Sequence, residues 1–257
     1  MQCATCRVKY LPSFEGIKAN QLGFRALNKF DTLKSKQRHL RDGFPETMGL
    51  RVHRAISWIG KAEQSKSDPD AAFLFYWIAF NAAYADETDV ATEAPLGERS
   101  QFVEFLTRLV KLDQQGQLHD ALWLKFRGPV AKLMENRYVY RPFWLNQNEV
   151  PGNEDWARKF RSSAERFVRA MADRQTARVL TLVFERLYML RCQMMHGGTT
   201  WGGKVNRDQV RDGASILGTL VPVMVDLMLD NPEEDWGRPF YPVVGPMPGV
   251  RRPQMRR

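Results

Sequence analysis

The sequence feature best suited to chemistry is an arginine followed five residues later by a histidine, at the end of a long apolar stretch. The segment reads Leu190-Arg191-Cys192-Gln193-Met194-Met195-His196-Gly197-Gly198. A guanidinium keeps its positive charge at physiological pH, whereas an imidazole gains and loses a proton near neutrality. A double glycine is a frequent stop signal for a helix. The pattern therefore predicts a fixed cation beside an acid–base group where a helix ends.

Such a pair of groups suits the cleavage of RNA. The reaction needs a base for the 2′-hydroxyl proton, an acid for the leaving 5′-oxygen and a cation for the charge that builds on the phosphorus centre. Arg191 would supply the cation, and His196 would supply the acid or the base. Since one histidine does not easily fill both roles in one step, we expect two copies of the chain to share a composite groove as a homodimer.

Helices must position these residues. Apolar side chains recur at three- and four-residue steps through most of the chain, and no alternating strand pattern, repeat or glycine-rich phosphate loop is present. The sequence therefore predicts an all-α bundle. Residues 138–153 are expected to form a loop, and Gly128-Pro129 to break the fourth helix. The expected helices cover residues 47–62, 68–84, 102–109, 118–134, 156–171, 179–196 and 208–229, the sixth of them ending at the double glycine.

The second of these helices is apolar nearly all round, which indicates a central and buried position. Asp68 and Pro69 are typical of a helix start. The lone amide of Asn81 lies within this run, and an amide in an apolar setting is costly unless it is paired. Asn81 is therefore expected either to hydrogen-bond another helix or to support Arg191 and His196.

At two segments the chain resembles the HEPN superfamily, compact α-helical bundles that include many metal-independent ribonucleases. Members carry arginine, four to six residues and then histidine, often as RN-x-x-x-H-G, and an earlier helix similar to YWIAFNALY. Here the corresponding segments are Arg191–Gly198 and Tyr76–Tyr84. The resemblance implies a HEPN-like bundle with additional helices, acting as an RNA endonuclease without a cofactor. It also implies His196 as the acid–base residue, Arg191 as the phosphate-binding cation, and a homodimer with an antitoxin or antiviral-defence partner.

The chain departs from the family pattern directly after the arginine. The family often has a polar Asn, Asp or His there, whereas this chain has Cys192, whose thiol is a weak hydrogen-bond donor. Gln193 is a candidate substitute, although its side chain leaves the helix about 100° further round. Three alternatives therefore stay open: a non-catalytic module that binds RNA, nucleotide or a partner protein, a purely structural bundle, and a thiol enzyme that uses Cys192.

Composition and charge are typical of a globular protein that binds polyanions. The chain has 257 residues, 44% of them hydrophobic, and a formal net charge of +9, which favours nucleic acid as a partner. The predicted organisation is a basic N-terminal extension (1–46), a HEPN-like helical domain (47–231) and a Pro/Arg-rich, loosely attached tail (232–257).

Neither a membrane segment nor a metal site is expected. No apolar run is expected to reach the roughly 18 residues of a membrane span, and the N-terminus lacks a signal-peptide core, so a cytoplasmic location is expected. Cys3 and Cys6 form one CxxC, which is half of a zinc site, and no second pair at suitable spacing is evident.

Overall fold

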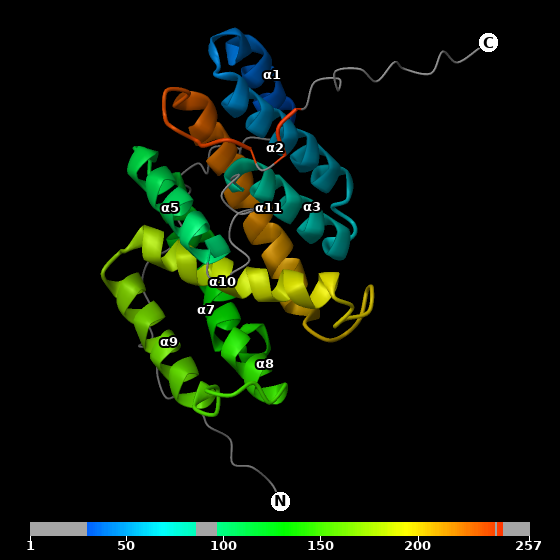
Figure 1. Cartoon of the computed structure of the whole chain (residues 1–257), viewed down its shortest axis with the longest axis vertical. Helices are drawn as coiled ribbons and strands as arrows, with labels where there is room; N and C mark the ends of the chain where they lie inside the picture. Colours follow the sequence, from blue (N-terminus) through cyan, green and yellow to red (C-terminus); the bar gives the residue numbers. More distant parts are fainter. Residues whose placement is uncertain (1–29, 86–96, 240, 244–257) are drawn as a thin grey trace, which may run out of the picture.

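The computed structural model describes residues 30–85, 97–239 and 241–243 of the chain (Figure 1). Within these residues it contains ten α-helices and no β-strand, which confirms the all-α class. The helices are α1 (Phe30–Leu40), α2 (Glu46–Gln64), α3 (Pro69–Tyr84), α5 (Gly97–Leu112), α6 (Gln117–Asp120), α7 (Arg127–Glu135), α8 (Arg141–Gln147), α9 (Trp156–Ala172), α10 (Thr176–Met195) and α11 (Arg207–Asp230).

The helices form two groups that α10 connects. Helices α1, α2, α3 and α11 pack together at one end of the elongated molecule, and α8 packs on α9 at the other (Figure 1). Helix α10 crosses between the groups and contacts α5, α7, α9 and α11. The two ends of α10 therefore lie on opposite sides of the molecule.

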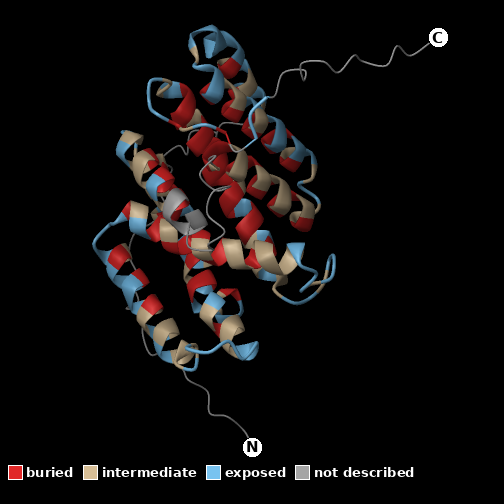
Figure 2. Ribbon diagram, in the orientation of Figure 1, coloured by how far each residue is buried: buried red, intermediate tan, exposed pale blue. Residues whose placement is uncertain are grey.

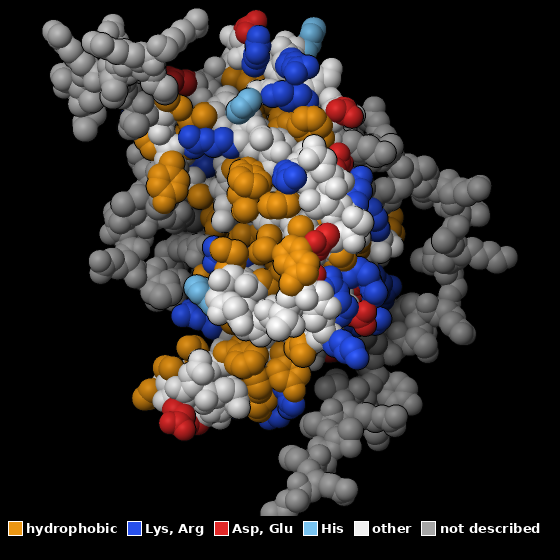
Figure 3. Space-filling model, turned by 90° about the vertical axis from the view of Figure 1, so that its right-hand side faces the viewer, with side chains coloured by type: hydrophobic (Ala, Val, Ile, Leu, Met, Phe, Trp, Pro, Cys, Tyr) orange, Lys and Arg blue, Asp and Glu red, His pale blue; other side chains and the backbone are white. Residues whose placement is uncertain are grey.

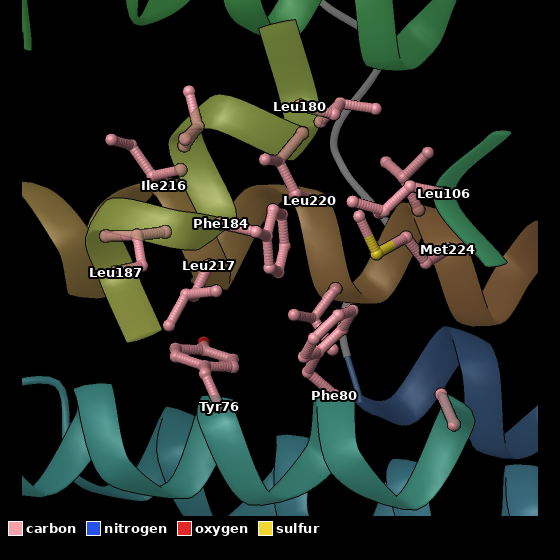
Figure 4. Close-up of a cluster of buried hydrophobic side chains, with 14 of the residues drawn as sticks. Tyr76, Phe80, Leu106, Leu180, Phe184, Leu187, Ile216, Leu217, Leu220 and Met224 are labelled. Carbon is pink, nitrogen blue, oxygen red and sulfur yellow. The ribbon is translucent and has the colours of Figure 1, made fainter. Parts of the chain in front are cut away.

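The core is centred on α3 and α11, as the apolar run of residues 73–84 predicted. Asp68 caps α3 by accepting hydrogen bonds from the backbone N–H groups of Asp70 and Ala71. Side chains of α3 point toward α10 and α11, and the rings of Phe80 and Phe184 lie 4.4 Å apart (Figure 4). Most of α11 is buried (Figure 2). Packing across these helices fixes the position of α10.

Two local expectations were wrong. The fourth helix is interrupted before Gly128, because Ala121–Lys125 form a π-helical segment that ends where Phe126 donates to the carbonyl of Ala121. Gly128-Pro129 instead lie in the first turn of α7, where a missing N–H costs nothing. The expected loop contains α8, which starts with Pro142 in its first turn and buries Phe143.

Part of the expected N-terminal extension is helical and packed. Helix α1 contacts α2 and α11, and its Leu33 is fully buried. The ammonium of Lys36 lies 2.6 Å from Asp226 and 2.7 Å from Asp230, both on α11. Residues 30–40 are therefore joined to the body of the fold, and residues 1–29 lie outside the described residues.

The beginning of the expected loose tail is attached, which corrects the prediction as far as residue 243. Trp236 is buried, and its ring lies 6.0 Å from that of Phe105. The buried guanidinium of Arg51 donates to the carbonyl oxygens of Ala83 and Ala85 at the end of α3, and to those of Gly237 and Arg238. A buried cation needs acceptors, so these carbonyls hold the chain after α11 in place.

One described helix, α11, is long and apolar enough to cross a membrane, contrary to the expectation that no such run exists. Inside the protein, however, 78% of its most apolar window is buried. Core helices pass the same test of length and composition, so this is weak evidence for a membrane span.

Candidate functional site

Helix α10 ends as the double glycine predicted. Gly197 has φ +70, in the left-handed region that glycine adopts most easily. The N–H of Gly198 donates to the carbonyl of Gln193 at 2.7 Å, and the N–H of Gly197 donates to that of Met194. This pair of bonds is a Schellman motif, which leaves His196 as the C-cap residue.

Arg191 is half-buried beside its own helix. Its guanidinium carbon lies 5.9 Å from the centre of the Tyr188 ring, and Nη1 lies 4.0 Å from the sulfur of Cys192. No carboxylate in the described part of the chain forms an ion pair with Arg191. The i, i+3 spacing of Tyr188 and Arg191 in the sequence is the local signal for this contact.

His196 is exposed, and no described residue hydrogen-bonds its ring. Five residues correspond to about 140° of rotation in a regular helix, so Arg191 and His196 do not share one face of α10. No hydrogen bond links the two side chains within the described residues. The structure thus leaves both groups accessible at one helix end without joining them inside a single protomer.

Gln193 has a structural role that the sequence did not reveal. Its amide nitrogen donates to the carbonyl of Tyr138, and its amide oxygen accepts from Asn206 at 2.9 Å. Asn206 lies just before α11 and has φ 55. The Gln193 amide therefore ties the end of α10 to the 3-10 turn Arg137–Val139 and to the start of α11.

Asn81 does not make the interhelical hydrogen bond expected of its carbonyl. Its Oδ1 is buried without a hydrogen-bond partner, as is the indole N–H of Trp77 one turn earlier. Neighbouring Phe80 packs on Phe184, which lies seven residues, or about 10 Å of helix, before Arg191. The structure gives no contact between Asn81 and the pair at the end of α10.

Large apolar side chains are exposed beside the end of α10. The exposed fractions are 57% for Met195, 68% for Trp201 and 71% for Val205, the latter two in the segment that joins α10 to α11. Hydrophobic side chains lie next to Lys and Arg on the face that carries this end (Figure 3). Such exposure is typical of surfaces that meet a partner.

The described residues contain no group of three His, Cys, Asp or Glu side chains able to hold a metal ion. Cys3 and Cys6 lie outside them. No protein-family model, curated protein or solved structure matches the chain.

Proposed function

We propose that this chain is a HEPN-like, metal-independent endoribonuclease. The observation that carries the proposal is the end of α10, where the described residues offer the Arg191 guanidinium no carboxylate partner and the His196 imidazole is exposed just before the terminating glycine. A phosphodiester could therefore bind to either group. The +9 net charge of the chain favours a polyanionic substrate.

The proposed reaction is transesterification within the RNA strand. One His196 takes the proton of the 2′-hydroxyl, whose oxygen then bonds to phosphorus. The bond from phosphorus to the 5′-oxygen breaks, and the second His196 protonates that oxygen. Arg191 neutralises the negative charge that gathers on the non-bridging oxygens. The products are a 2′,3′-cyclic phosphate and a free 5′-hydroxyl.

A second copy of the chain would complete this site. One protomer offers one histidine and directs Arg191 away from it, whereas a two-fold pair brings two of each group together. The exposed Met195, Trp201 and Val205 supply apolar area for that contact. Burying them between protomers would also shield the reacting phosphate from water.

The deciding experiment is cleavage of end-labelled RNA by the purified protein in EDTA. We expect cyclic-phosphate ends from the wild type, and loss of cleavage in His196→Ala and in Arg191→Met. His39→Ala is the matched control, because His39 is also exposed and lies on α1, far along the chain from the site. Full cleavage by His196→Ala, or cleavage that EDTA abolishes, would refute the mechanism.

One observation favours a non-catalytic RNA-binding module as the second candidate. The family pattern has a polar residue after the arginine, but here Cys192 follows, and the Gln193 amide is engaged with Tyr138 and Asn206. A weak donor would orient the phosphate less well. In that case the wild type binds RNA without cutting it, and His196→Ala binds equally well.

A further inference from the structure

A hollow lined by three arginines lies where α9 ends and α10 starts. Figure 1 shows that this start of α10 lies across the molecule from the end that His196 caps. Its volume is about 250 Å³. Buried Ala170 contributes to its wall. The lining residues are Arg166, Arg169, Ala170, Asp173, Gln175 and Arg178.

The charge of this arginine hollow is unbalanced. None of Arg166, Arg169 and Arg178 forms an ion pair with a described residue, and Arg178 only donates a long 3.5 Å hydrogen bond to the Gln175 side chain. Asp173 is the single carboxylate of the lining, and its oxygen accepts from Gln175. Three guanidiniums thus face one carboxylate in a concave space, an arrangement that favours an anion.

The start of α10 adds to the positive charge. Gln175 makes no side-chain capping bond there, and the first turn contains no acidic residue. Arg178 lies in this first turn, where the helix dipole disfavours a cation. An anion between Arg178 and the two arginines of α9 would relieve that repulsion and would also be favoured by the helix dipole.

We propose that the arginine hollow binds a backbone phosphate of the RNA, well away from the linkage that is cut. This inference rests on the proposed function and names a second contact of the same substrate. The hollow is smaller than the roughly 300–1,000 Å³ of pockets that enclose drug-sized ligands, so it suits one phosphate rather than a whole nucleotide. One guanidinium can donate two parallel hydrogen bonds to two oxygens of the same phosphate.

Helix α10 sets the distance between the two contacts. His196 follows Arg178 by 18 residues, which is five turns at 3.6 residues per turn. The two side chains therefore start from the same side of α10, about 27 Å apart along its axis. A stacked strand that rises about 3.4 Å per nucleotide needs about eight nucleotides to span that distance. Short RNAs reach one end of α10 but not both.

Binding can be measured without cleavage, using the His196→Ala protein and a fluorescent 16-nucleotide single-stranded RNA. Replacing Arg166, Arg169 and Arg178 by Gln should weaken the affinity at least tenfold. It should also lower the slope of log affinity against log salt by about 0.7, the value for one lost phosphate contact on a single strand.

The control is a second triple variant that loses the same charge at three exposed arginines on other elements. Its substitutions are Arg38→Gln, Arg41→Gln and Arg127→Gln. It should weaken binding less than threefold. Equal losses in the two triple variants, no loss in the hollow variant, or no RNA binding by the His196→Ala protein would each overturn the proposal. Circular dichroism checks that each variant is folded.

Cleavage of short and long RNAs tests the spacing. In the background that retains His196, the hollow variant should lower kcat/KM at least tenfold for a 16-nucleotide RNA, mainly through KM, and leave a 4-nucleotide RNA unchanged. An equal loss on both RNAs would overturn the bridging contact. If the wild type cuts neither RNA, the proposed function fails, whereas the salt-slope measurement still decides whether the hollow binds phosphate.

Discussion

Gly218 of α11 lies so close to Tyr76 of α3 that a β-carbon on the glycine would come within 2.8 Å of the tyrosine ring. Gly218→Ala should therefore lower the free energy of unfolding by about 1–3 kcal/mol, because overpacking outweighs the gain in helix propensity. Urea denaturation followed by circular dichroism measures this change.

The matched control is Gly49→Ala in α2, where the added carbon would lie 3.8 Å from Phe44, an ordinary contact. Here only the helix propensity changes, so stability should rise by up to about 1 kcal/mol. We therefore expect the free energy of unfolding to fall in Gly218→Ala and to rise in Gly49→Ala. A stabilising Gly218→Ala would show that α3 and α11 are not packed as described.

Tyr76 should make the protein sensitive to alkali. Burial, aided by the Glu63 carboxylate, raises the pKa of Tyr76 to about 12, from the 10.0 of a free tyrosine. Between these pH values the folded protein keeps a proton that the unfolded chain has released. The free energy of unfolding should therefore fall as the pH rises from about 10 toward about 12.

Tyr76→Phe isolates this contribution, because phenylalanine has no proton to lose. Urea midpoints between pH 9 and 11.5 should fall more steeply for the wild type than for Tyr76→Phe. Absorbance at 295 nm should also show that the variant has one fewer tyrosine that loses its proton well above pH 10. Parallel stability curves for the two proteins would contradict the assignment.

The starts of α3 and α11 are joined by a partly buried ion pair, in which Arg207 Nη1 lies 2.5 Å from Asp70 Oδ2. Asp70 is only 5% exposed, whereas the Arg207 side chain keeps 29% of its surface, so Asp70→Asn leaves a partly solvated cation without its carboxylate. We expect a loss of about 1–3 kcal/mol in urea denaturation, the range for a lost hydrogen bond between charged groups. Asp208→Asn breaks an exposed pair with Arg211 and should cost under about 1 kcal/mol.

Gly197→Ala tests whether the end of α10 positions His196. Alanine at φ +70 is strained by about 1–2 kcal/mol, so the last turn should loosen or shift. We expect a matching loss of stability and at least a tenfold loss of kcat/KM for RNA cleavage. Gly128→Ala adds a β-carbon with nothing within 4 Å and no positive φ, and should leave cleavage unchanged.

Sequence periodicity predicted the parts of the fold that depend on local order. The cap of α3 by Asp68 and the glycine end of α10 both involve neighbours in the chain, and both are present. The amide of Gln193 could not be placed in this way, because its partner Tyr138 lies 55 residues away. The likeness of Arg191–His196 to a ribonuclease pair stays a prediction, since no hydrogen bond links the two side chains within the described residues.

The contacts of residues 30–40 and 236–238 could not be predicted for a related reason. Lys36 forms ion pairs with acidic residues of α11, and Arg51 donates hydrogen bonds to carbonyl groups 186 and 187 residues further along the chain. Neither contact leaves a periodic trace in the sequence. Basic or proline-rich composition therefore gave no sign of these contacts.

The four carbonyl groups around Arg51 set a limit on how far the protein can be shortened. Cutting the chain after Asn231 would remove two of the acceptors of a fully buried guanidinium and would uncover Phe105 by taking away Trp236. Affinity tags, fusions and proteolytic trimming therefore belong beyond residue 243. A shorter recombinant product should be prone to aggregation even though every helix of the bundle is still encoded.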